Sequence, residues 1–141
     1  MKEISIINGP NLNLLGSTRK HLYGNVTLTQ LNEKIEAFAK EHNTLVHTHQ
    51  FNAEGQIIDA VHNASAMNGI VINPAAYTHY SYGIRAAIEA ISTPVVEVHI
   101  SNIHQGESFR KISVIAPACV GQISGLGWQG YLLAIRHRLE K

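Results

Sequence analysis

Short apolar runs alternate along this chain with segments whose apolar side chains recur every three or four residues. The runs predict five buried strands, over residues 4–7, 45–51, 69–72, 95–100 and 120–124. The helically spaced segments predict amphipathic helices, over residues 28–41, 54–66, 81–91 and 128–140. Thr27 and Gln30 have the spacing of a capping box before the first helix. Residues 101–117 are mixed and predict one short helix at most.

Strands that alternate with helices indicate βαβ units and a parallel sheet. Five such strands within 141 residues predict one α/β domain over residues 1–141, flavodoxin-like, with helices on both faces of the sheet. In such sheets ligands bind outside the carboxyl ends of the strands. Candidate chemistry is therefore expected in the loops that follow the strands, over residues 8–23, 52–54, 73–81, 99–110 and 125–130.

The composition narrows the possible partners. Eleven basic and ten acidic residues give a net charge of +1, which argues against a nucleic-acid binder because such proteins carry a basic excess. Only 15% of the residues are charged, against about 25% usually, and this fits a surface partly covered by other subunits. No apolar run approaches the roughly 18 residues of a membrane helix, and no signal-peptide pattern is present. The chain is expected in the cytoplasm, away from membranes.

Residues 125–130 match the G-x-G-x-x-G pattern of dinucleotide-binding proteins. That site also needs a further strand with an acidic residue about 20 positions on, and the sequence has no such strand after residue 130. These glycines are better interpreted as a tight turn that lets the last helix pack closely.

The sequence predicts no metal site. His47 and His49 share one face of a strand, but no third ligand is in sight, so ordinary strand side chains are the better interpretation. The single cysteine, Cys119, excludes an intrachain disulfide and lacks a neighbouring CxxC or basic cluster, so it is interpreted as a structural thiol.

Functional groups gather in the loops expected at the carboxyl edge: Asn11, Arg19, Tyr23, Asn73, His79, Glu97, His99, Ser101 and Arg110. Arginine binds carboxylates, amides and imidazoles bind hydroxyls, and tyrosine or histidine can move protons. The set suits a polyhydroxylated acid. Glu97 and His99 are two apart on one strand, so the carboxylate can orient the imidazole. The alternative, favoured if this strand is taken alone, is a capped core histidine.

Several motifs, in order, resemble type II 3-dehydroquinate dehydratase over essentially the whole length. The resemblance rests on the segments 7–16 (INGPNLNLLG), 23–24 (YG), 27–28 (TL), 73–76 (NPAA), 78–79 (TH) with Ser81, 96–102 (VEVHISN), 109–110 (FR) with Ser113, and 125–127 (GLG) with 130–131 (GY). It implies a flavodoxin-like subunit, trimers assembled into a dodecamer, and elimination of water from 3-dehydroquinate through an enolate, without metal or cofactor.

The resemblance also implies a role for each matching residue. Tyr23 would remove the proton next to the ketone, and His99, held by Glu97, would protonate the departing hydroxyl. Asn11 would stabilise the enolate through a water molecule. The substrate carboxylate and ring hydroxyls would be held by the backbone N–H groups of Ile100 and Ser101 and by the side chains of Asn73, His79 and Arg110.

Three positions depart from the family pattern. Thr18 stands where the family has the arginine that favours the Tyr23 phenolate, and Arg19 follows one residue later as a candidate replacement. Ala86 replaces an aspartate that reaches a neighbouring subunit, and Gly106 replaces a second arginine. Three interpretations therefore stay open: an active dehydratase, a weak or inactive homologue that binds a cyclic hydroxy acid, and a related lyase or isomerase with another substrate.

Overall fold

One parallel sheet organises the chain, and the computed structural model describes residues 1–140 of it. The strands lie in the order β2-β1-β3-β4-β5, and each pair of neighbours is parallel. Their bounds are β1 (Lys2–Asn8), β2 (Thr44–Gln50), β3 (Gly69–Asn73), β4 (Val95–His99) and β5 (Gly121–Ser124). The predicted flavodoxin-like α/β fold is confirmed.

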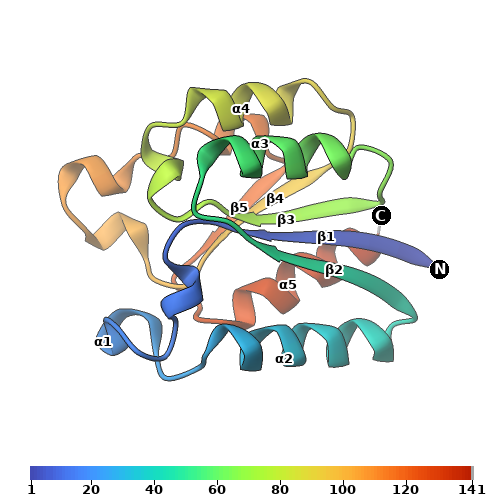
Figure 1. Cartoon of the computed structure of the whole chain (residues 1–141), viewed down its shortest axis with the longest axis horizontal. Helices are drawn as coiled ribbons and strands as arrows, with labels where there is room; N and C mark the ends of the chain where they lie inside the picture. Colours follow the sequence, from blue (N-terminus) through green and yellow to red (C-terminus); the bar gives the residue numbers. More distant parts are fainter. Residues whose placement is uncertain (141) are drawn as a thin grey trace.

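Helices cover both faces of the sheet (Figure 1). On one face lie α2 (Leu28–Glu41) and α5 (Gln129–Leu139), and on the other lie α3 (Glu54–Asn63) and α4 (Tyr82–Glu89). A single turn, α1 (Lys20–Tyr23), stands in the loop after β1. Short 3-10 turns complete the described part of the chain: η1 (Leu12–Leu14), η2 (Ala75–His79), η3 (Ile103–Gln105), η4 (Ser108–Lys111) and η5 (Ala116–Ala118).

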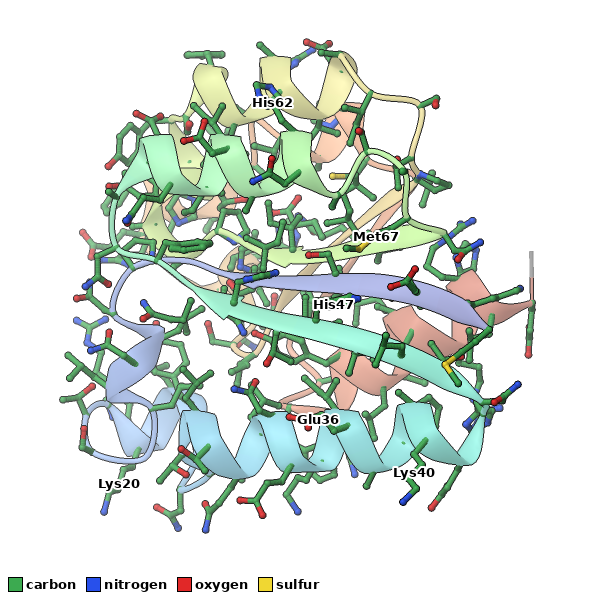
Figure 2. All side chains as sticks on the ribbon, turned by 45° about the vertical axis from the view of Figure 1, so that its right-hand side comes forward. Lys20, Glu36, Lys40, His47, His62 and Met67 are labelled. Atoms are coloured by element: carbon green, nitrogen blue, oxygen red, sulfur yellow. The ribbon has the colours of Figure 1, made fainter. Side chains whose placement is uncertain are left out.

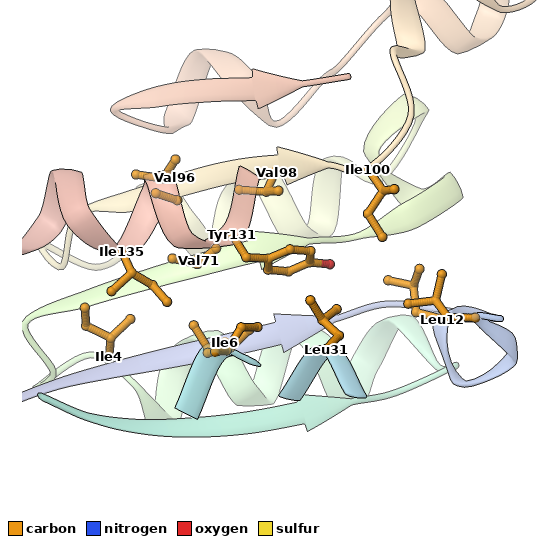
Figure 3. Packing of buried hydrophobic residues seen from close by; sticks show 13 residues of the cluster. Ile4, Ile6, Leu12, Leu31, Val71, Val96, Val98, Ile100, Tyr131 and Ile135 are labelled. Carbon is orange, nitrogen blue, oxygen red and sulfur yellow. The ribbon is translucent and has the colours of Figure 1, made fainter. Parts of the chain in front are cut away.

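The helix α2 shows how the apolar pattern becomes packing. Leu31 and Ile35 lie four residues apart and are fully buried against the sheet. Each such side chain contributes about 1.5–3 kcal/mol by leaving water. Figure 3 shows Leu31 in the core that fills the space between sheet, α2 and α5, and Figure 2 shows Glu36 and Lys40 on the same helix. Both of these charged residues are exposed.

Side-chain caps mark the start of two helices, α2 and α4. The capping box is confirmed, because Thr27 Oγ1 accepts from the Gln30 N–H at 3.1 Å and Gln30 Oε1 accepts from the Thr27 N–H at 3.0 Å. Ser81 is the N-cap of α4 rather than its first residue, since its Oγ accepts from the Ile84 N–H at 3.0 Å. Residues 101–117 hold three 3-10 turns that begin there, not one short helix. None of the helices among residues 1–140 is long and apolar enough to cross a bilayer.

The glycine-rich turn before α5 has a packing role, as interpreted from the sequence. Gly125 and Gly127 have φ angles of 91° and 65°, which side chains with a Cβ rarely adopt. A Cβ at Gly130 would lie 3.3 Å from Ile123 Cγ2 and 3.4 Å from Val98 Cγ1. The turn and Gly130 thus let α5 approach the sheet closely.

Candidate active site

The carboxyl ends of the strands meet at one edge of the sheet, on the left in Figure 1. β1 lies between β2, which is an edge strand, and β3. After β1 the chain therefore runs first to one side of the sheet, and after β2 it crosses to the other side. This switch in direction is where flavodoxin-like sheets bind ligands. The loop that carries α1 and the segment 101–118 lie on this side (Figure 1). The sequence-predicted site residues follow β1, β3 and β4 or end these strands, except Glu97, which lies within β4.

A buried carboxylate–imidazole pair closes β4. Glu97 is 0% exposed and His99 is 5% exposed. Because strand side chains alternate, residues two apart share a face, and His99 Nε2 hydrogen-bonds Glu97 Oε2. An ionised carboxylate only accepts, so Nε2 donates and Nδ1 is the ring nitrogen left for another partner. The structure therefore brings together the pair that the sequence predicted.

Two hydroxyl groups also donate to the Glu97 carboxylate. Ser113 Oγ lies 2.8 Å from Oε1 and 3.0 Å from Oε2, and Thr78 Oγ1 donates to Oε2. Burial by itself raises the pKa of the Glu97 carboxyl, but the hydrogen bond and charge of His99, together with the two hydroxyls, outweigh it and hold the pKa below its usual value. Glu97 is thus an anion fixed beside His99.

Substitution of Ser113 by alanine is expected to raise the pKa of the Glu97 carboxyl, because the hydroxyl whose one proton is shared between the two oxygens of the charged form disappears. A carboxyl whose folded-state pKa is lowered adds stability above its unfolded pKa, and this stability is lost as pH falls through the folded value. In Ser113→Ala the stability that the ionised Glu97 contributes is therefore lost at a higher pH than in the parent. The free energy of unfolding at neutral pH should also fall by about 1–3 kcal/mol.

The measurement is the carboxyl ¹³C shift of Glu97 followed against pH, together with urea unfolding. Ser108→Ala is the matched control, because Ser108 is exposed in the same loop and its hydroxyl contacts none of the groups around Glu97. A Glu97 titration midpoint that is unchanged in Ser113→Ala would show that the hydroxyl does not control the charge.

Backbone donors lie next to this pair. Ile100 and Ser101 follow His99 at the end of β4, and neither of their N–H groups is hydrogen-bonded to another of residues 1–140. The carbonyls of His99 and Ile100 accept from Gly125 and Gly127 at 3.2 and 3.0 Å, which fixes this peptide segment. Two free N–H groups in a fixed backbone suit an anion such as a carboxylate.

Tyr23 ends α1 and is half-buried against the core between the sheet, α2 and α5. Arg19 is exposed at the N-cap of the same turn with a φ of 47°, and its carbonyl accepts from the Tyr23 N–H at 3.0 Å. The structure therefore places Arg19 and Tyr23 in one turn. The Arg19 side chain makes no hydrogen bond or ion pair with another described residue, so its role stays a prediction.

The other predicted ligand-binding residues differ in which of their polar atoms are already hydrogen-bonded within the protein. Asn11 lies after β1 with a φ of 69°, and its N–H donates to Asn52 Oδ1 at 3.0 Å. His79 Nδ1 donates to the Ile112 carbonyl at 2.8 Å, which leaves Nε2 free. Arg110 is part-exposed, 3.5 Å from a Glu107 oxygen.

Asn73, at the end of β3, is 3% exposed, and both ends of its amide have protein partners. Its Nδ2 donates to the Tyr131 hydroxyl and its Oδ1 accepts from the Ala75 N–H. Sequence reasoning gave no role to Tyr131, nor to Thr78 and Ser113 beside Glu97. Their only signal was that each stands in a segment that resembles the family.

Groups away from this edge have structural explanations. His47 Nε2 lies 2.9 Å from Glu3 Oε1 across the neighbouring strand, and no group of three metal-ligating side chains occurs within the described chain. Burial, with a smaller effect of the Glu97 charge, raises the pKa of the Cys119 thiol to about 12, which disfavours the reactive thiolate. A hollow lined by Lys2, His42 and Arg136 lies at the amino ends of the strands, remote from these loops.

Comparison with known proteins agrees with this geometry. Residues 2–139 match the family model "Dehydroquinase class II". The chain is 56% identical over 137 residues to 3-dehydroquinate dehydratase of Caldicellulosiruptor saccharolyticus, which covers 96% of this chain and 94% of the relative. It is 52% identical to the Anoxybacillus flavithermus protein of the same name, over 99% of this chain and 95% of that one.

Solved structures agree as well. The type II dehydroquinase from Butyrivibrio crossotus superposes with a TM-score of 0.96 and 48% identity, over 99% of this chain and 98% of that one. The type II dehydroquinase from Propionibacterium acnes also gives 0.96, at 36% identity, over 100% of this chain and 98% of that one. With its sheet order, its buried Glu97–His99 pair and these relatives, the chain belongs to the class II dehydroquinase family.

Proposed function

We propose that this chain dehydrates 3-dehydroquinate to 3-dehydroshikimate by an anti elimination through an enolate. As a member of its family, with relatives about half identical over nearly their full length, it is a 3-dehydroquinate dehydratase. The roles of individual residues are the proposal. The observation that carries them is the buried Glu97–His99 pair beside the free N–H groups of Ile100 and Ser101.

The acid half of the reaction belongs to His99. When the enolate collapses, the carbon–oxygen bond to the departing hydroxyl breaks, and the hydroxyl needs a proton to leave as water. His99 gives that proton from Nδ1, since Nε2 is held by Glu97. His99 and the hydroxyl partners hold the pKa of the Glu97 carboxyl low, so Glu97 stays an anion facing the imidazole and does not take the proton itself.

The base half belongs to Tyr23. Its phenolate removes the proton from the carbon next to the ketone, and the electron pair moves into the enolate. A free phenol ionises near pH 10, so a cation must favour the phenolate at neutral pH. Arg19, in the same turn as Tyr23, is the cation that we assign to this task. Asn11 stabilises the enolate oxygen through a water molecule.

Substrate binding completes the assignment. The N–H groups of Ile100 and Ser101 hold the carboxylate, because they lack acceptors among residues 1–140. His79 and Arg110 contact ring hydroxyls and carboxylate from the segments that follow β3 and β4, and Asn73 contacts them from the end of β3. The fixed Nδ1–H of His79 makes its free Nε2 an acceptor for a hydroxyl when the ring is neutral.

The test of the function is direct. Purified protein is incubated with 3-dehydroquinate, and the ultraviolet absorbance of the conjugated enone product is followed. A rise that scales with protein concentration is expected. Folded, assembled protein that gives no rise would contradict the proposal and would return attention to a binding protein or to another hydroxylated keto acid.

Those two alternatives, which the altered positions 18, 86 and 106 left open, are not favoured by the comparisons. Relatives that are 52–56% identical over nearly their full length are named 3-dehydroquinate dehydratase. In this structure Ala86 and Gly106 are both exposed, so neither leaves a hole in the core or a buried charge without its partner.

We further propose that the chain assembles into trimers and that these form a dodecamer. Large apolar side chains are exposed on α4 and in the segments that lead to β5, among them Tyr82, Ile112 and Val120 at 56–68%, and burial in an interface would remove them from water. Sedimentation is expected to give a mass several times that of the 15.5-kDa chain. Trimers alone would contradict the dodecamer, and monomers at micromolar concentration would contradict both assemblies.

The state of the single cysteine bears on the compartment in which the enzyme works. We place the enzyme in the cytoplasm, which is a reducing environment. The one cysteine, Cys119, is a free thiol in this structure, and burial keeps it protonated. This agrees with a protein that needs no disulfide for its fold.

A further inference from the structure

Tyr131 links the two strands that flank the switch point of the sheet. It lies in the first turn of α5 and is fully buried. Its hydroxyl donates to Asn8 Oδ1 at 2.6 Å and accepts from Asn73 Nδ2 at 2.9 Å. Figure 3 shows the ring within the core, with the hydroxyl directed toward Leu12 and Ile100, beyond the strand ends. One side chain from the last helix thus holds the final residues of β1 and β3.

We call the hydrogen bonds that join Ala75 N–H, Asn73, Tyr131 and Asn8 the Tyr131 relay. The donor and the acceptor in each of these bonds follow from the Ala75 N–H. The Ala75 N–H donates to Asn73 Oδ1 at 3.1 Å, and only an oxygen can accept there. Asn73 must therefore turn Nδ2 toward Tyr131. The phenol has a single proton, which goes to Asn8 Oδ1. Burial raises the pKa of the Tyr131 hydroxyl above that of an ordinary phenol, so this proton is retained.

The relay decides which atoms of the amides remain for a ligand. Asn73 has used its oxygen on Ala75 and one Nδ2 hydrogen on Tyr131, so one Nδ2 hydrogen remains. Asn8 has used its oxygen, and its buried Nδ2 has no partner among the described residues. The unused hydrogens of both amides are therefore on Nδ2, and each Oδ1 already accepts one hydrogen bond. The free Nδ2 hydrogen of Asn73 suits an oxygen acceptor at the end of β3, such as a carboxylate or a hydroxyl lone pair.

We infer that Tyr131 is a positioning residue that fixes the Asn73 amide as a donor to a substrate oxygen. This inference rests on the proposed assignment of Asn73 to substrate binding. Without the phenol, the remaining Ala75 contact holds only one end of the amide. Asn73 can then tilt away from the substrate, although Tyr131 itself contacts no substrate atom.

The experiment is Tyr131→Phe, which removes one oxygen and keeps the ring that fills the core. The expected result is a fall of about tenfold in kcat/KM, with most of the change in KM, as for the loss of one oriented hydrogen bond. In an Asn73→Ala background the same substitution should have almost no further effect, because the residue through which it acts is gone. Ile135→Val is the matched control, since Ile135 is fully buried in the same helix and takes no part in the hydrogen bonds of Tyr131, Asn8 and Asn73.

A second readout does not depend on turnover. In the folded parent, the side-chain NH₂ group of Asn73 should give two well-separated proton resonances with slow exchange, and Tyr131→Phe should bring them together and speed exchange. Three results would overturn the inference: unchanged kcat/KM in Tyr131→Phe, an equally large fall when Tyr131→Phe is added to the Asn73→Ala background, or unchanged Asn73 amide resonances. A parent without dehydratase activity would overturn the proposed function instead, and the amide resonances would still decide the relay.

Discussion

Replacement of His99 by glutamine is expected to lower kcat by about 10²- to 10⁴-fold, the range usual for loss of a general acid. Glutamine has similar reach and can still donate to Glu97 Oε2, so the buried carboxylate keeps a partner. Its amide protons are far too weakly acidic to be transferred to the departing hydroxyl. KM should change little, because substrate binding is assigned to the Ile100 and Ser101 N–H groups and to the residues around them. Initial rates from enone absorbance provide kcat and KM.

The control for this substitution is His104→Gln. His104 is exposed in η3, five residues further along, and its ring hydrogen-bonds Gln122 Oε1 at 3.4 Å, not Glu97. It should keep the parental kcat. Urea unfolding of both variants separates a catalytic loss from a folding loss. If His99→Gln retains kcat within a few-fold of the parent, His99 is the capped core histidine that the strand taken alone suggested.

The fold was predictable because its signals are local. Apolar runs and three-to-four-residue spacing follow directly from strand and helix geometry, and the capping box of Thr27 and Gln30 spans only three residues. The segment 101–117 was not resolved into its 3-10 turns, because such short turns carry no hydrophobic period. Its conformation depends on distant contacts, such as the Val114 N–H that donates to the Thr78 carbonyl.

The difference between local and long-range contacts also explains which parts of the site were predicted and which were missed. Glu97 and His99 are two residues apart on one strand, so their contact follows from the alternation of side chains. Thr78 and Ser113 reach Glu97 across 19 and 16 residues, and Tyr131 reaches Asn8 across 123. No spacing rule connects such positions. Only the folded sheet edge shows that hydroxyls surround the carboxylate and that a phenol joins the two amides.

One departure from the family pattern has a steric consequence in this chain. A Cβ at Gly106 would lie 3.2 Å from Arg110 Cβ and 3.3 Å from its Cδ. Glycine therefore leaves room for Arg110 to lie beside Glu107 and over the Phe109 ring, 4.9 Å from its centre. A side chain at position 106 would require Arg110 to move. Nothing in the structure explains why alanine stands at position 86.

Replacement of Tyr23 by phenylalanine is expected to lower kcat by about 10²- to 10⁴-fold at every pH, because the group that removes the proton is absent. The substitution keeps the half-buried ring that packs against the core, so the free energy of unfolding should change little. The measurement is kcat against pH by enone absorbance. Tyr80→Phe is the control, since Tyr80 is 59% exposed, and it should keep the parental profile.

Arg19→Ala distinguishes the role of Tyr23, which takes the proton, from that of Arg19, the cation proposed to favour the phenolate. If Arg19 supplies the cation that favours the phenolate, Arg19→Ala loses activity at neutral pH and regains much of it as the pH rises toward the ordinary ionisation of a phenol, near 10. Tyr23→Phe cannot regain activity in this way, because it has no group to ionise. An Arg19→Ala profile equal to that of the parent would remove Arg19 from the mechanism and leave Tyr23 in it. A Tyr23→Phe variant with the parental kcat would contradict the assignment of Tyr23 as the base, because phenylalanine has no oxygen that could take the proton.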